Sequence, residues 1–282
     1  MNTMHQKHPI LWLGAHKTGT TFLQNALDLS AGALESAGYR YMSLVAFRNH
    51  YLRPLIYDGN HGEPPPPPPG LNLIFDENIP GLVQGALGTT GLYPRTAERS
   101  RKVADHFGLR TPDIYFCVRN YATFLPSLFC ETLKSTPYRP FARFYDPDQH
   151  PLDWNSVIDQ LRAAFPDSRI SVYQNEALRG REAALLSYIT GIPAADFTIP
   201  SGTERPGFSH KAVRTLYHLS KTRTVSRADV FAAVRHYPKG TDWPAFDPLS
   251  DEAKADLTTA YQQHVRRLRD RDDVHFIALD QL

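Results

Sequence analysis

The stretch Pro9-Ile10-Leu11-Trp12-Leu13-Gly14, with the turn Ala15 to Thr21 after it, decides the fold that we expect for this chain. An apolar run bounded by Pro and Gly is typical of a short buried strand. The turn is rich in Gly and Thr, and an apolar pattern of helical period continues from Phe22 until Gly38. The chain therefore begins with a strand, a glycine turn and a helix.

Further strands and helices follow from the same criteria. Strands are expected at Leu71–Phe75, Ile114–Val118, Ile170–Tyr173 and Val274–Ala278, with a weaker candidate at Tyr39–Leu44. Helices are expected at Thr96–Phe107, Thr123–Lys134, Trp154–Phe165, Glu182–Thr190, His210–Thr222 and Asp251–Arg269. Alternation of apolar strands with helices predicts a mostly parallel sheet covered on both faces, a three-layer α/β/α fold.

Length and composition restrict the class of protein. The 282 residues suit a single large α/β domain, residues 1–282, in which a proline-rich loop, 61–70, forms either a stiff surface segment or the rim of a pocket. A net charge of +2 does not indicate a nucleic-acid partner or a membrane-surface protein. Cys117 and Cys130 cannot form a disulfide framework, and the apolar run from Ile10 is too short for a signal peptide or a membrane span. We expect a cytoplasmic, not membrane-spanning protein.

The turn after the first strand has the composition of an anion-binding site. It reads Gly14-Ala15-His16-Lys17-Thr18-Gly19-Thr20-Thr21 and leads into a helix, whose first turn offers unpaired N–H groups. The glycines let the backbone approach an anion, the threonines add hydroxyl donors and Lys17 adds a charge. It is not a Walker A motif, because no Gly-Lys pair is present.

The run His16-Lys17-Thr18-Gly19-Thr20-Thr21-Phe22-Leu23-Gln24 resembles the phosphosulfate-binding loop of the sulfotransferases that use 3′-phosphoadenosine-5′-phosphosulfate (PAPS), in the form found in their bacterial branch. The resemblance implies a P-loop-like fold and transfer of the sulfuryl group of PAPS, without a metal ion, to a hydroxyl or amine of a small-molecule, sugar or lipid acceptor. It assigns the 5′-phosphosulfate to residues 16–21, with Lys17 stabilising the departing phosphate. His16 either contacts a substrate or supports the loop.

The same family holds the 3′-phosphate of PAPS with an Arg at a strand end and a Ser eight residues later. Arg119 and Ser127 match that spacing, although Pro126 predicts a kink or a late start of the helix that carries Ser127. The stretch Lys239-Gly240-Thr241-Asp242-Trp243 is similar to a late segment of the family that also contacts this phosphate. Lys239 is therefore either a further contact or part of a surface turn.

A catalytic base is expected where the strand Leu71–Phe75 ends in Asp76 and Glu77. Related sulfotransferases place a His or Glu at this position, and we select Glu77, with Asp76 in reserve. An apolar strand that ends in Asp-Glu also fits the Mg²⁺-binding segment of a P-loop kinase or nucleotide hydrolase, and either carboxylate can instead cap a turn. A non-catalytic nucleotide-binding module is a third alternative.

Overall fold

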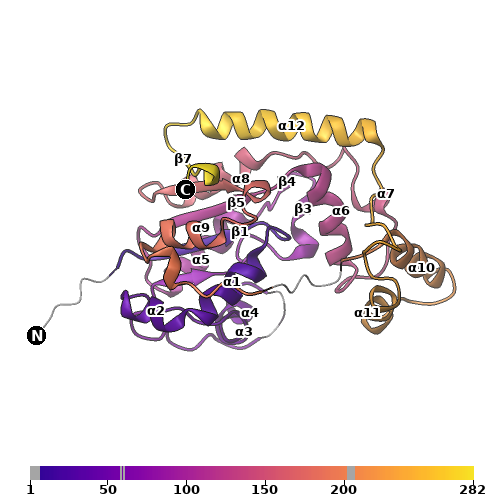
Figure 1. The fold of residues 1–282 in the computed structure, drawn as a ribbon. Coiled ribbons are helices and arrows are strands. Elements are labelled where there is room, and N and C mark those ends of the chain that lie inside the picture. The colour runs from indigo at the N-terminus through magenta and orange to yellow at the C-terminus, as the bar shows by residue number, and fades with distance from the viewer. Residues whose placement is uncertain (1–6, 58, 60, 202–206) are drawn as a thin grey trace, which may run out of the picture.

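Five parallel strands form the central sheet of the computed structural model, which describes residues 7–57, 59, 61–201 and 207–282. Their order is β2-β1-β5-β6-β7, and helices cover both faces, so the predicted three-layer α/β/α fold is confirmed (Figure 1). The strands are β1 (Ile10–Gly14), β2 (Leu73–Phe75), β5 (Asp113–Val118), β6 (Ile170–Gln174) and β7 (His275–Phe276). A separate antiparallel hairpin consists of β3 (Leu87–Gly88) and β4 (Gly91–Leu92).

Side chains of the inner strands are buried on both faces, as expected for a parallel sheet between two helical layers. Ile10 and Trp12 pack in one apolar cluster, and Leu11 and Leu13 pack in the other. The first cluster lies under α1 (Thr20–Leu29), α2 (Ala31–Ser36) and α9 (Glu182–Thr190). The second lies under α5 (Thr96–His106), α6 (Tyr121–Thr132), α8 (Trp154–Ala164) and α12 (Asp251–Arg269).

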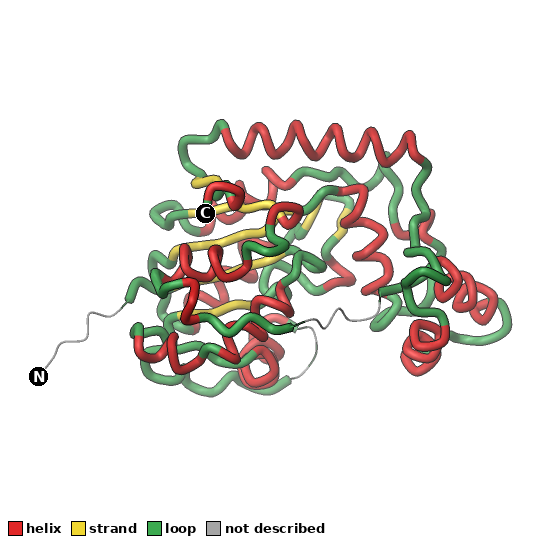
Figure 2. Tube along the Cα trace, in the orientation of Figure 1, coloured by secondary structure: helices red, strands yellow, loops and turns green. Residues whose placement is uncertain are grey.

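The remaining helices are shorter or stand to one side. Helices α10 (His210–Ser220) and α11 (Arg227–His236) pack on each other beyond one end of the sheet (Figures 1 and 2). Between β1 and β2 the chain forms α3 (Leu44–Phe47), a π-helical turn (Arg48–Leu52) and α4 (Arg53–Ile56), and α7 (Phe141–Phe144) follows α6. Single 3₁₀ turns occupy Val83–Gly85, Asn175–Ala177, Ala194–Asp196 and Leu279–Gln281.

Some predicted elements differ from the observed ones. The first helix is broken at Ser30 into α1 and α2, and helix α11 was not predicted. The strand candidate Tyr39–Leu44 is wrong, because only Tyr41 makes an isolated bridge, to Leu73. Helix α6 begins earlier than predicted because the side chain of Asn120 caps it, and Pro126 lies inside the helix.

The proline run is held against the domain by hydrogen bonds to its carbonyl groups. Tyr51 donates to the carbonyl of Pro66 at 3.2 Å, and Arg40 donates to that of Pro69 at 2.7 Å. Most of its side chains are exposed. The segment is therefore a surface loop.

Both cysteines, Cys117 and Cys130, are free and buried. Within the described part of the chain, no helix combines the length and the apolar character that a membrane span needs.

Gly14 tests how tightly β1 joins α1. A Cβ atom at Gly14 would lie 2.7 Å from Cγ2 of Thr20, too close for carbon atoms in contact. We expect Gly14→Ala to lower the free energy of unfolding by about 1–3 kcal/mol, as for other overpacked positions. Urea denaturation measures this loss.

A matched control removes the clashing methyl group. Thr20→Ser in the Gly14→Ala background should recover most of the lost stability, whereas Thr21→Ser in that background should not. Equal effects of the two serine substitutions would show that the close approach to Thr20 is not the cause.

Candidate active site

The strand order places a crevice between the carboxyl ends of β1 and β5. After β1 the chain crosses to β2 on one side, and later it continues with β5 on the other side. In open parallel sheets, ligands bind at such a reversal of strand order. The loop Ala15–Gly19 follows β1 and Arg119 follows β5, so both predicted anion-binding elements lie at this point.

The loop has an unusual backbone that depends on its neighbours. Lys17 has a φ angle of 67° and Gly19 one of 77°, so both adopt the left-handed conformation. For a lysine this conformation is strained by about 1 kcal/mol or more, and such strain concentrates at functional sites. The carbonyl of Lys17 accepts a hydrogen bond from Nη1 of Arg119, and the hydroxyl of Thr18 donates to the carbonyl of Ala15 at 2.6 Å.

His16 links the loop to two residues outside it, Tyr93 and Asn78. Its backbone N–H donates to the hydroxyl of Tyr93 at 2.8 Å, and its Nδ1 lies 3.0 Å from the same oxygen. Its Nε2 lies 2.8 Å from the amide of Asn78, which is best oriented with its nitrogen toward His16 and its oxygen toward Arg48. Burial lowers the pKa of His16, so the ring is neutral at pH 7. Both ring nitrogens are engaged, which suits loop support.

The two carboxylates after β2 occupy different surroundings. Asp76 is fully buried and accepts from Arg48 at 2.6 and 2.8 Å, in a two-pronged pair that a divalent ion would have to displace. Glu77 reaches the cleft, with Oε1 2.9 Å from Nη2 of Arg48 and Oε2 3.2 Å from the amide of Gln24. Burial raises the pKa of Asp76. Burial is also the largest influence on Glu77 and opposes its ionisation, but the charge of Arg48 and the hydrogen bonds to the carboxylate together outweigh it and lower the pKa of Glu77.

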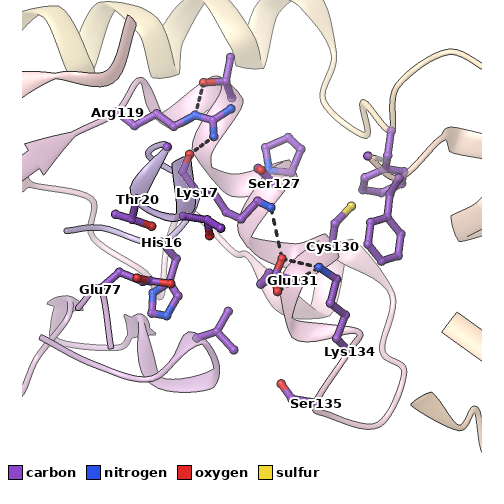
Figure 3. A pocket seen from close by; sticks show the side chains of 18 of the residues that line it. His16, Lys17, Thr20, Glu77, Arg119, Ser127, Cys130, Glu131, Lys134 and Ser135 are labelled. Carbon is purple, nitrogen blue, oxygen red and sulfur yellow. Dashed lines mark hydrogen bonds and ion pairs between the residues drawn. The ribbon is translucent and has the colours of Figure 1, made fainter. Parts of the chain in front are cut away.

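Helix α6 carries the second predicted anchor. Nε of Arg119 donates to the hydroxyl of Thr123 at 3.0 Å, and Ser127 lies one helical turn further on the same face. Burial lowers the pKa of Arg119, yet a guanidinium remains charged at neutral pH. Figure 3 shows Arg119, Ser127 and Lys17 grouped on one side of the cleft.

The cleft has a volume of about 1440 Å³ and collects most of the predicted site residues. Its lining includes nine of them: His16, Lys17, Gly19, Thr20, Thr21, Glu77, Arg119, Ser127 and Lys239. Thr18 and Asp76 are fully buried and are not among the lining residues that the structure describes. The hydroxyl of Thr18 donates a hydrogen bond within the loop, and Asp76 binds Arg48.

The cleft is more positive than the protein as a whole. Among the described residues, its charged lining consists of Lys17, Arg48, Arg119, Lys134, Arg227, Lys239, Lys254, Glu77, Glu131 and Asp247. Seven cations and three anions give a formal charge of +4, against +2 for the whole chain. The cleft is therefore suited to a ligand with several negative charges.

Two lining residues of clear importance were not predicted from the sequence. Arg48 joins Asp76 to Glu77, but its π-helical turn has no motif that would have revealed it. Glu131 lies between Lys17, at 3.2 Å, and Lys134, at 2.8 Å. Its spacing of four residues from Ser127 is a signal that could have found it, because residues at i and i+4 share a helix face.

No protein-family model matches this chain, and no curated protein matches it significantly. The functional assignment therefore depends on the residues of the cleft and their geometry.

The ion pairs around Arg48 predict a pH-dependent loss of stability in Arg48→Met. Near pH 7 this change should cost about 3–5 kcal/mol, because it leaves buried carboxylates without their counter-charge. Lowering the pH should reduce the difference in the free energy of unfolding between the parent protein and the variant. In the variant, the carboxyls that have lost their cation protonate as the pH falls and then no longer need one. In the parent, Asp76 protonates near its raised pKa of about 6, whereas the stability that depends on the lowered pKa of Glu77 is lost only below the ordinary pKa of a glutamate.

Urea denaturation at neutral and mildly acidic pH provides the measurement. Asp105→Asn is the control, because it removes an exposed ion pair with Arg101 and should cost no more than about 1 kcal/mol at either pH. A loss in Arg48→Met that does not change with pH would rule out carboxylate pairing as its cause.

Proposed function

We propose that this protein is a sulfotransferase that moves the sulfuryl group of PAPS to a hydroxyl or amine of a small-molecule, sugar or lipid acceptor. One observation carries the proposal. Three stretches that are distant in the sequence line one cleft at the reversal of strand order: the loop at Lys17, the strand end at Glu77, and Arg119 with Ser127. They correspond to the phosphosulfate loop, the base and the 3′-phosphate anchor that the motif implies.

The charge and the size of the cleft fit the binding of two substrates, one of which is strongly anionic. PAPS carries a phosphosulfate at one end and a phosphate on its ribose, which matches a lining with a formal charge of +4. The volume of about 1440 Å³ exceeds the roughly 300–1,000 Å³ of a site for one small molecule. Donor and acceptor can therefore occupy the cleft together, as direct transfer requires.

The loop would bind the end of PAPS that carries the sulfuryl group. The left-handed residues Lys17 and Gly19 precede the first turn of α1, whose free N–H groups and dipole favour an anion. The side chains of Thr20 and Thr21 add hydroxyl donors along the cleft. Arg119 and Ser127 would bind the 3′-phosphate, and Lys239 is available as a further cation on the cleft wall.

The chemistry we propose is an in-line displacement at sulfur. The acceptor oxygen or nitrogen attacks the sulfur while the bond from sulfur to the bridging oxygen breaks. The proton of the acceptor goes to Glu77, and Lys17 stabilises the charge that develops on the phosphate leaving as part of adenosine 3′,5′-bisphosphate. Glu77 is favoured over Asp76 because it is ionised and lines the cleft, whereas Asp76 is enclosed with Arg48.

We also propose a cytoplasmic location. The supporting observation is that Cys117 and Cys130 are both free and buried, as in proteins of reducing compartments.

Glu77→Gln tests the base. Turnover with labelled PAPS should fall by about 10²–10⁴-fold, because the amide cannot accept the acceptor's proton. Calorimetric affinity for adenosine 3′,5′-bisphosphate should stay close to that of the parent protein, since Glu77 is not part of the donor grip. Asp76→Asn should reduce stability yet keep transfer activity where the protein is folded. The opposite pattern would assign the base to Asp76.

Arg119→Ala tests the 3′-phosphate anchor. Affinities for adenosine 3′,5′-bisphosphate and adenosine 5′-phosphate should both fall, because Arg119 also binds the carbonyl of Lys17. The bisphosphate should lose about 10–100-fold more, as expected for a lost charged hydrogen bond. Ser127→Ala should change the same ratio by a smaller factor. An equal loss for both ligands would mean that Arg119 acts only through the loop.

A further inference from the structure

Helix α6 presents one continuous polar stripe to the cleft. Thr123, Ser127 and Glu131 follow one another at intervals of four residues and line the cleft together. Thr123 binds Arg119, and Ser127 lies in the proposed 3′-phosphate site. The third residue, Glu131, reaches the loop itself, and the donor machinery as proposed gives it no role.

Glu131 is a charged group held between two lysines. Its carboxylate lies 3.2 Å from Nζ of Lys17, and its two oxygens lie 2.8 and 3.1 Å from Nζ of Lys134 (Figure 3). Burial disfavours its ionisation, but the two lysines outweigh this and lower the pKa of Glu131. The protein thus holds a negative charge of its own against the lysine that the proposed function assigns to the donor.

Both the backbone and the side chain of Lys17 are held by other residues. Arg119 binds its backbone carbonyl, and Glu131 binds its ammonium group. A negatively charged group that enters the loop must therefore share the ammonium with Glu131 or displace it. Two negative charges that share one ammonium group repel each other, and the repulsion is stronger than in bulk water because Glu131 is partly buried, where the local dielectric constant is lower.

We infer that the carboxylate of Glu131 competes with the sulfuryl group of the donor for the ammonium group of Lys17. Its carboxylate binds Lys17 in this structure and moves to Lys134 alone when the donor enters. Lys134 can receive it because both carboxylate oxygens are already within reach of its ammonium. Glu131 is then a positioning residue that acts through Lys17, and this inference rests on the proposed sulfotransferase function.

The competition should depend on the sulfuryl group. The proposed mechanism places Lys17 at the oxygen that bridges phosphorus and sulfur, so in PAPS both the 5′-phosphate and the sulfuryl group lie beside its ammonium group. Adenosine 3′,5′-bisphosphate has only the phosphate there and leaves more room for the carboxylate of Glu131, so Glu131 should weaken the binding of PAPS more than that of the bisphosphate.

Glu131→Gln is the primary test, with calorimetric titration of both nucleotides. The amide keeps hydrogen-bonding atoms but removes the charge. We expect affinity for PAPS to rise about tenfold, a typical effect of removing one nearby charge from a partly buried site, and affinity for the bisphosphate to change less. An unchanged ratio of the two affinities, or a fall in that for PAPS, would overturn the inference.

A double-mutant cycle with Lys134→Met tests the second position of the carboxylate. Alone, Lys134→Met should weaken PAPS binding, because Glu131 loses its alternative partner and stays on Lys17. In the Glu131→Gln background the same change should have little effect, since Lys134 acts through Glu131. Equal effects in both backgrounds would mean that Lys134 attracts the donor directly, which contradicts the inference.

The two proposals can fail separately. A parent protein without measurable affinity for adenosine 3′,5′-bisphosphate would overturn the proposed function. A parent protein that binds both nucleotides, but whose preference is the same after Glu131→Gln, would overturn only the role of Glu131. Thermal unfolding of each variant, with Glu131→Ala as a second substitution, shows whether the fold is retained.

Discussion

The conformation of the loop between β1 and α1 is the constraint on which the rest of the site depends. A lysine in the left-handed conformation is not stable on local grounds, so other parts of the chain must hold it. Tyr93 binds the backbone N–H of His16, and Arg119 binds the carbonyl of Lys17. These partners follow the β3–β4 hairpin and strand β5, so the shape of the loop depends on distant parts of the assembled fold.

A second constraint is the balance of charge within a poorly solvated region. Arg48 satisfies Asp76 and Glu77 together, and Glu131 satisfies Lys17 and Lys134 together. The first arrangement carries one net negative charge and the second one net positive charge, and all of these side chains except Asp76 line the cleft. The cleft is cationic, in a chain with a net charge of only +2, because seven cations and only three anions are found among its described lining residues.

The sequence predicted the central sheet well because burial on both faces makes apolar runs that stand out against their surroundings. Helices α9 and α12 were also predicted with their observed ends, since Gly191 follows α9 and Ser250 caps α12. Helix α11 was missed although Ser226 and Asp229 form a capping box, because the apolar residues 230–234 that follow them form one continuous run without a helical period. Arg48 could not be found, because its importance comes from partners 28 and 29 residues away that only the folded sheet brings close.

The register of the sheet explains why the donor-binding half of the proposed site could be predicted from the sequence and the other half could not. Trp12 pairs with Phe75, so Glu77 is level with Gly14, and Gly14 pairs with Cys117, so Arg119 is level with His16. Motifs at strand ends therefore meet wherever parallel strands are in register. Another part of the lining, with Phe208 and Phe246, comes from segments around α10 and α11 that no strand aligns. If the proposed function holds, acceptor specificity depends on that part of the lining, and it can change without disturbing the register that brings the loop and base together.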